Sequence, residues 1–258
     1  MTEPLLTLDR LTVEFPDPHR RGARMRAVDD VSLTLQAGEI LGLVGESGSG
    51  KTTLGKTLLR LCAPRSGRIL LRGTDISHLA EGALRPHRRQ MQMVFQDPLS
   101  SFNPRQTIGA ALAVPLRLHR LCPPDRIAAA VESLLADVGL PKDFSRRFPH
   151  QLSGGQLQRA AIGRALVLSP ALIVADEAVS KLDVSVRAQI LNLLRRVHAE
   201  KGLSLLFITH DLHVARFLCH RIAVMRRGRL VEIGPTARLF AAPEHAYTKA
   251  LLGTVAPV

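Results

Sequence analysis

Alternating apolar and polar residues dominate the N-terminal part of the chain. Residues 5–15 (LLTLDRLTVEF) and 28–35 (VDDVSLTL) alternate with a period of two, which is typical of strands that bury one face. Residues 36–38 (QAG) supply a turn after the second segment. These patterns predict an antiparallel β layer.

The apolar segments that follow are short and nearly continuous. Residues 39–45 (EILGLVG) end in glycine and are typical of a strand buried on both faces, and a helix is predicted over Thr52–Leu61. Further strands are predicted at Arg68–Arg72, Met91–Phe95, Leu172–Ala175 and Leu205–Ile208. Strands separated by helical or turn-rich segments favour an α/β core with a largely parallel sheet, whose strand order the sequence leaves open.

The strand pattern stops over residues 95–170, where helical patterns take its place. Within residues 125–138 the apolar positions follow a helical period, at Ile127, Val131, Leu134 and Leu135. Farther along, RIAVMRRGRLVEIG is typical of a hairpin that turns at Arg227-Gly228, and residues 243–252 predict a short closing helix.

The chain has 258 residues, of which 46% are hydrophobic, so it is long enough to bury a sizeable core. We expect a single domain over residues 1–258. Its predicted parts are a core of residues 1–95 and 171–235, an inserted helical subdomain of residues 96–170, and a short C-terminal extension of residues 236–258.

A glycine-rich loop lies between the predicted buried strand and the helix. Residues 45–52, GESGSGKT, match GxxxxGK[ST] at every fixed position, in the strand-to-helix context that identifies a phosphate loop. Its amides and the helix N-terminus suit the α and β phosphates of a nucleotide, Lys51 reaches the β and γ phosphates, and Thr52 offers a hydroxyl to magnesium. The predicted nucleotide-binding residues are Gly45, Glu46, Ser47, Gly48, Ser49, Gly50, Lys51, Thr52 and Thr53.

Polar side chains end three other apolar strands, where the ligands of parallel sheets bind. ALIVADE ends in Asp176, expected to hold magnesium, and Glu177, expected to polarise the attacking water. LLFITHD brings His210 to the same edge as a γ-phosphate donor, and MQMVF is followed by Gln96, whose amide can touch magnesium or water. Without the phosphate loop, Asp176 and Glu177 would indicate a solvated strand end and His210 a structural histidine, whereas the presence of the loop favours the functional interpretation.

A second phosphate-binding motif lies about 100 residues farther along the chain. LSGGQ, residues 152–156, places a serine and two glycines at the start of a predicted helix, which is a favourable anion site. Because a nucleotide has one terminal phosphate, this motif serves either another ligand or a nucleotide held by another molecule.

The six motifs, in the order GESGSGKT, Gln96, LSGGQ, ALIVADE, SKLD and ITHD, resemble the nucleotide-binding subunit of ABC transporters over nearly the whole chain. This resemblance implies a P-loop NTPase (ABC ATPase) fold, with a mainly parallel sheet, an N-terminal antiparallel layer and an inserted helical subdomain. It also implies hydrolysis of ATP with Mg²⁺, in which Lys51, Gln96, Glu177 and His210 are the catalytic residues and Thr52, Gln96 and Asp176 bind the metal.

In that family the signature loop contacts ATP held by the opposite subunit. The resemblance therefore implies that four residues complete the partner's site, Ser153, Gly154, Gly155 and Gln156, and that Asp183 lies at the interface. Phe15 matches an aromatic residue that stacks on adenine, although an alternating strand can also bury it.

The partners implied are a second ABC ATPase subunit (self or sister), two transmembrane permease subunits and, indirectly, an extracytoplasmic substrate-binding protein. The expected location is the cytoplasmic face of the bacterial inner membrane, as a peripheral subunit. The N-terminus lacks a signal-peptide pattern, and the most apolar stretch, residues 160–175, is interrupted by polar residues and a proline.

Two segments resemble the importer branch for dipeptides, oligopeptides and nickel: FQDPLSSFNPRQTIG (residues 95–109) and VEIGPTARLFAAPEHAYTKALL near the end. DEAVSKLD departs from the usual family pattern at Ala178 and Lys181 and resembles nickel-importer ATPases. This similarity, with the lack of a cysteine-rich tail, favours a metal or metal complex as cargo, with peptides as the alternative.

The net charge does not identify a binding partner, and the cysteine positions indicate no covalent or metal cross-link. The net charge of +13 is spread along the chain, which fits an ordinary surface as well as phosphate ligands, membranes or nucleic acid. We expect no nucleic-acid partner, because neither a second cassette nor a long coiled-coil insertion is visible over residues 53–152. The separated Cys62, Cys122 and Cys219 predict neither a disulfide framework nor a zinc site.

Overall fold

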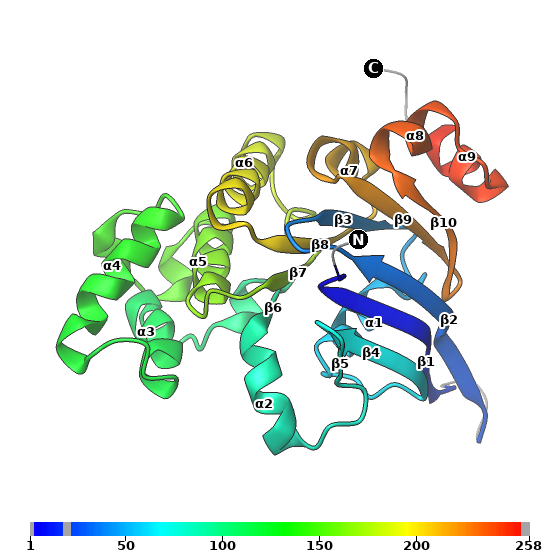
Figure 1. The fold of residues 1–258 in the computed structure, drawn as a ribbon. Helices are drawn as coiled ribbons and strands as arrows, with labels where there is room; N and C mark the ends of the chain where they lie inside the picture. Colours follow the sequence, from blue (N-terminus) through cyan, green and yellow to red (C-terminus); the bar gives the residue numbers. More distant parts are fainter. Residues whose placement is uncertain (1–2, 18–21, 254–258) are drawn as a thin grey trace.

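The N-terminal strands form an antiparallel sheet, as the alternating pattern predicts. The computed structural model describes residues 3–17 and 22–253 and contains a four-stranded sheet of order β2-β1-β4-β5 (Figure 1). Its strands are β1 (Leu6–Pro16), β2 (Arg24–Leu35), β4 (Ser66–Leu71) and β5 (Thr74–Asp75).

The prediction that the strand at Arg68–Arg72 belongs to the parallel core is wrong. This strand is β4, which pairs antiparallel with β1, and Ile69 lies opposite Leu8. The physical reason lies in its burial pattern, because Ile69 and Leu71 are buried whereas Leu70 between them is only partly covered. Such one-sided burial is typical of an antiparallel layer.

The larger sheet has six strands in the order β10-β9-β3-β8-β7-β6. These strands are β3 (Ile40–Val44), β6 (Met91–Val94), β7 (Leu172–Asp176), β8 (Ser204–Thr209), β9 (Arg221–Arg226) and β10 (Arg229–Pro235). All pairings are parallel except that of β10 with β9, the predicted hairpin. Every residue of β3, β7 and β8 is buried, which explains their continuous apolar sequences.

Helices cover the larger sheet and continue beyond its β6 edge. The α-helices are α1 (Lys51–Leu58), α2 (Glu81–Gln90), α3 (Ile108–Leu118), α4 (Ile127–Asp137), α5 (Gly154–Leu166), α6 (Val184–Lys201), α7 (Leu212–Leu218), α8 (Thr236–Ala241) and α9 (Ala246–Gly253). Short 3₁₀ turns are η1 (Leu99–Ser101), η2 (Pro124–Arg126), η3 (Lys142–Arg146) and η4 (Pro149–Gln151). Helices α3 and α4 lie to one side of the sheet, in green in Figure 1, and pack with α5.

The predicted helix bounds need small corrections. The first helix ends at Leu58 and not at Leu61, because Arg60 adopts φ 55° and the Leu61 amide turns back to the Lys56 carbonyl at 2.9 Å. The closing helix α9 begins at Ala246, three residues later than predicted. The last five residues of the predicted C-terminal extension, 254–258, lie outside the described part of the chain.

The larger sheet separates two hydrophobic cores. One core joins this sheet and α1 to the antiparallel sheet, through residues such as Leu41 and Leu54. The other joins its opposite face to α5, α6 and α7, and includes the fully buried Phe207. Within the described residues no helix is both long and apolar enough to cross a membrane, and Cys62, Cys122 and Cys219 are free cysteines.

We predict that Phe207→Ala lowers the free energy of unfolding by about 3–5 kcal/mol, because it leaves a cavity between the sheet and its helices. Chemical denaturation measures the change. Phe217→Ala is the matched control, because that ring is 49% exposed and its removal should cost less than about 1 kcal/mol. Equal losses for the two variants would contradict this description of the core.

Candidate functional site

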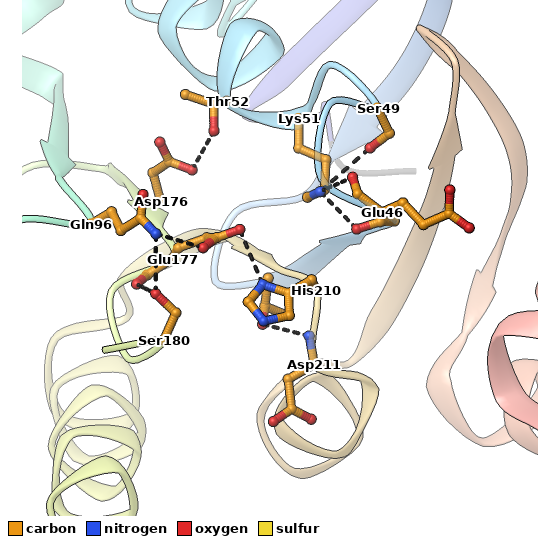
Figure 2. A network of polar contacts seen from close by, with 12 residues as sticks. Glu46, Ser49, Lys51, Thr52, Gln96, Asp176, Glu177, Ser180, His210 and Asp211 are labelled. Carbon is orange, nitrogen blue, oxygen red and sulfur yellow. Dashed lines mark hydrogen bonds and ion pairs between the residues drawn. The ribbon is translucent and has the colours of Figure 1, made fainter. Parts of the chain in front are cut away.

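Parallel pairing brings the ends of four strands to one edge of the larger sheet. Val44 of β3 lies opposite Thr209 of β8, and Asp176 of β7 lies opposite Ile208 of β8. Val94 at the end of β6 is likewise level with Ala175. The residues that follow these strand ends therefore meet, and Figure 2 shows their polar side chains converging from separate loops.

The loop of residues 45–52 owes its path to glycines at close approaches. A Cβ atom on Gly45 would lie 2.1 Å from the Met225 carbonyl oxygen, and one on Gly50 would lie 2.1 Å from that of Ala27. Gly50 also adopts φ 102°, where it precedes the first turn of α1. A side chain at either position would displace the loop, so glycine allows the loop backbone to run close to β2 and β9.

The ammonium group of Lys51 is folded back over this loop. Its Nζ donates to the carbonyl oxygens of Gly45 and Glu46, both at 2.7 Å. Burial lowers the pKa of Lys51, and the carboxylates of Glu177 and Asp176 act in the opposite direction. A third, longer hydrogen bond runs from Nζ to the Ser49 hydroxyl at 3.4 Å (Figure 2), so the hydrogen-bond acceptors of this buried cation are neutral, an environment that favours the arrival of an anion.

Thr52 and Asp176 form a pair of oxygen donors at the base of the loop. The Thr52 hydroxyl donates to Asp176 Oδ1 at 2.9 Å, and only 5% of Asp176 is exposed. Burial raises the pKa of the Asp176 carboxyl, and the Thr52 hydrogen bond partly opposes this effect. Hard oxygen donors with a desolvated carboxylate fit Mg²⁺, whose charge would offset the cost of that burial.

Glu177 lies between Gln96 and His210 (Figure 2). Gln96 Nε2 donates to Glu177 Oε2 at 2.8 Å, and His210 Nδ1 lies 3.2 Å from Glu177 Oε1. The Glu177 backbone adopts φ 46°, and its amide donates to the Ile208 carbonyl at 2.9 Å. Both carboxylate oxygens are thus oriented by neighbours while the group remains accessible, which suits a general base.

A hollow of about 580 Å³ lies over the loop. Its lining combines the loop with Gln96 and Glu177, and Phe15 and Met25 add apolar surface. The Phe15 ring is 37% exposed, so the strand does not bury it. The described residues that line the hollow are Phe15, Met25, Arg26, Ala27, Ser47, Gly48, Gly50, Lys51, Thr52, Thr53, Gln96, Glu177, Arg227 and Gly228.

The LSGGQ segment forms the N-terminus of α5. The Ser153 hydroxyl accepts from the Gln156 amide at 3.3 Å, and the Gln156 side chain accepts from the Ser153 amide at 2.9 Å. A Cβ atom on Gly155 would lie 2.3 Å from Val186 Cγ1 of α6, so glycine is required there. None of residues 153–156 is among the described residues that line the hollow.

The loop that follows Glu177 leads from the buried core to the surface. Ala178 is 3% exposed and packs in the core, whereas Lys181 and Asp183 are exposed. Asp183 precedes α6 without a side-chain hydrogen bond to it, and Val184 is 81% exposed. Asp183 and Val184 are thus both open to solvent at the start of α6.

Comparison with known proteins identifies the family. Residues 28–180 match the family model described as ABC transporter. The chain belongs to the ABC transporter family. It is an ABC ATPase, an enzyme that binds and hydrolyses ATP, and its fold is the P-loop fold that the motifs predict.

Curated relatives of this ABC ATPase are named for peptide uptake. It is 49% identical over 262 residues to a probable peptide ABC transporter ATP-binding protein of Sinorhizobium fredii, covering 100% of this chain and 74% of the relative. It is 48% identical over 257 residues to the glutathione import ATP-binding protein of Escherichia coli, covering 98% of this chain. The chain spans only 41% of that second relative.

Solved structures show the same fold. The structure of cbiO1 from Clostridium perfringens, part of the transporter complex cbiONQ, gives a TM-score of 0.81 at 25% identity, covering 93% of this chain and 92% of cbiO1. The dimeric ATP-binding cassette MJ0796, in a post-hydrolysis state bound to ADP and Pi, gives a TM-score of 0.81 at 28% identity. The match covers 90% of this chain and 98% of the MJ0796 chain.

The structure brings six predicted site residues of the ABC ATPase into one cluster: Lys51, Thr52, Gln96, Asp176, Glu177 and His210. Residues 153–156 and Asp183 lie outside this cluster.

The sequence did not predict two hydrogen bonds that support the site. The Ser180 hydroxyl donates to the Glu177 carbonyl at 3.0 Å, and the Gly228 amide donates to the Ser49 carbonyl at 2.9 Å. The sequence predicted a hairpin turn at Gly228 but gave no sign that its amide would bond to Ser49.

We predict that Gly155→Ala lowers the free energy of unfolding by about 1–3 kcal/mol, because the new methyl group overlaps Val186. Gly154→Ala is the control, since its Cβ would lie 3.6 Å from the nearest side chain, an ordinary contact. Adding Val186→Ala to Gly155→Ala should recover most of the loss. Denaturant unfolding of the wild type and these three variants tests this, and no recovery in the double variant would rule out the overlap.

Proposed function

We propose that this ABC ATPase powers a bacterial importer of dipeptides, oligopeptides or related small peptides such as glutathione. The proposal that the chain hydrolyses ATP through Glu177 rests on the position of this residue between Gln96 and His210, beside a phosphate loop. The names of the relatives support the transport part.

The proposed roles follow from the positions of the side chains. The loop amides from Ser47 to Thr53 and the Lys51 ammonium hold the phosphates of ATP, Gly45 and Glu46 form the start of the loop, and Phe15 stacks on adenine. Thr52, Asp176 and Gln96 hold Mg²⁺, which neutralises charge on the phosphates. Glu177 accepts a proton from the attacking water, and His210 donates a hydrogen bond to the γ phosphate.

We further propose that ATP joins two subunits. Residues 153–156 form an anion-binding helix start that lies apart from the hollow of their own chain, so they are suited to a nucleotide held by another subunit. Asp183 then lies at the interface, close to the exposed Val184. The second subunit is either another copy of this chain or a sister ATPase.

The remaining partners are two permease subunits and, through them, an extracytoplasmic binding protein. A groove between the β6 edge and the helical segment is lined by Leu61, Met93, Val114 and Arg164, and it offers apolar surface to a permease helix. We propose that residues 96–170 act as the helical subdomain beside a core of 1–95 and 171–235. The chain then sits peripherally at the cytoplasmic face of the inner membrane.

The preference for nickel that DEAVSKLD suggested is not supported by the relatives, which are named for peptides and glutathione. Ala178 has a structural explanation, because its side chain is buried beneath the Glu177 loop. A small residue there fits the packing next to the base. A nucleic-acid partner finds no support in these names either.

We predict that Glu177→Gln lowers the rate of ATP hydrolysis by about 10²- to 10⁴-fold, because the amide cannot accept the proton of the attacking water. Binding of ATP should remain, and the ATP-bound variant should form a stable dimer with its partner subunit. Phosphate release and size-exclusion chromatography with multi-angle light scattering measure the two effects. Hydrolysis at the wild-type rate would reject Glu177 as the base.

We predict that deleting the gene makes cells resistant to a toxic dipeptide or tripeptide and leaves cellular nickel, cobalt and zinc unchanged in metal-poor medium. Peptide sensitivity and elemental mass spectrometry provide the measurements. The wild-type gene should restore sensitivity, whereas a Glu177→Gln copy should not. A selective loss of one metal with unchanged peptide sensitivity would instead assign the transporter to metal uptake.

A further inference from the structure

The C-terminal helix reaches back to the phosphate loop. Tyr247 of α9 accepts a hydrogen bond at its hydroxyl oxygen from the Glu46 amide, at 3.2 Å and across 201 positions of sequence. The Tyr247 residue is only 6% exposed, and the Arg226 guanidinium lies 4.7 Å from the centre of its ring. This contact comes from outside residues 28–180, the part that matches the family model.

The larger sheet fixes the position of α9. The Glu232 carboxylate of β10 accepts from the amides of Glu244 at 2.9 Å and His245 at 3.0 Å, just before the helix starts. The Tyr247 amide donates to His245 Nδ1 at 3.1 Å, and Leu252 packs against the core. The phenol is therefore held by a folded segment, and its hydroxyl has a defined position relative to the loop.

Glu46 connects this phenol to Lys51. The Glu46 carbonyl accepts from Lys51 Nζ at 2.7 Å, while the amide of the same residue donates to Tyr247. Glu46 is absent from the described residues that line the hollow, whereas Ser47 and Gly48 are among them. The Glu46 amide thus belongs to the outer side of the loop, where a partner other than phosphate must satisfy it.

We propose that Tyr247 is a positioning residue that holds the start of the phosphate loop in the geometry that binds ATP. Loss of its hydroxyl frees the Glu46 peptide, whose carbonyl orients the Lys51 ammonium. The C-terminal segment thereby sets the affinity of the chain for nucleotide. This inference rests on the proposed role of the loop and Lys51 in binding ATP.

The direct test is Tyr247→Phe, which keeps the ring and removes only the hydroxyl. By calorimetry, the Kd for MgATP should rise about 3- to 10-fold, the effect of one hydrogen bond. The rate at saturating ATP should change less than the KM. Hydrogen exchange should accelerate in the peptide covering residues 45–50 but not in β8, and saturating MgATP should restore its protection.

Thr236→Val is the matched control. Its hydroxyl is also buried in the C-terminal part of the chain and donates to the Cys219 carbonyl at 2.7 Å, without contacting the phosphate loop. This variant should change the Kd for MgATP by less than about twofold, because Thr236 shares no hydrogen-bond partner with the phosphate loop. An equal loss of affinity in both variants would indicate general destabilisation and overturn the proposal.

A second measurement leaves the fold intact. The sequence contains one tyrosine and no tryptophan, so labelling with 3-fluorotyrosine gives a single ¹⁹F resonance that reports on Tyr247. Titration with MgATP should move this resonance with the calorimetric Kd, and adenosine, which lacks phosphates, should not. A resonance that ignores saturating MgATP overturns the coupling, whatever the stability of the Phe variant.

Failure of the proposed function and failure of the role of Tyr247 give different experimental results. If the wild-type chain binds no MgATP, the proposed function is wrong. If the wild type binds MgATP, and Tyr247→Phe binds it equally well with unchanged exchange over residues 45–50, only the role of Tyr247 is wrong.

Discussion

Parallel pairing of β3, β8, β7 and β6 is the constraint on which the site depends. Neighbouring strands end within one residue of each other along the sheet, at Val44, Thr209, Asp176 and Val94, so the loops that follow emerge at one edge. Residues separated by more than 100 positions therefore share hydrogen bonds, as Thr52 and Asp176 do at 2.9 Å. A shift of one strand by one residue would move its polar terminus away from the others.

The fold places charged groups where solvent cannot stabilise them. Burial lowers the pKa of Lys51 and raises that of the Asp176 carboxyl, so each charge is less favourable there than in water. A magnesium nucleotide supplies both a polyanion for the lysine and a cation for the carboxylate. Affinity for such a ligand and reduced stability of the empty site thus have the same physical origin.

Much of this arrangement was predictable because the decisive patterns are local. The glycines and lysine of residues 45–52 predict a phosphate loop by themselves, and the presence of this loop gives the strands that end near Asp176 and His210 a functional interpretation. The failures involve distant contacts. The strand near Ile69 was placed in the wrong sheet, because its antiparallel pairing with β1 joins residues about 60 positions apart. Nothing in the sequence near Tyr247 indicated that its hydroxyl meets the phosphate loop.

The central claim is that two separate phosphate-binding elements of this sequence act on one nucleotide from two subunits. A structure of the chain with its partner ATPase subunit, Mg²⁺ and a non-hydrolysable ATP analogue tests it most directly. The account predicts Lys51 of one subunit and the signature serine, Ser153 in this chain, of the other within about 3 Å of the same γ phosphate. A γ phosphate held by the loop of one subunit, with no signature serine of the other near it, would contradict the claim.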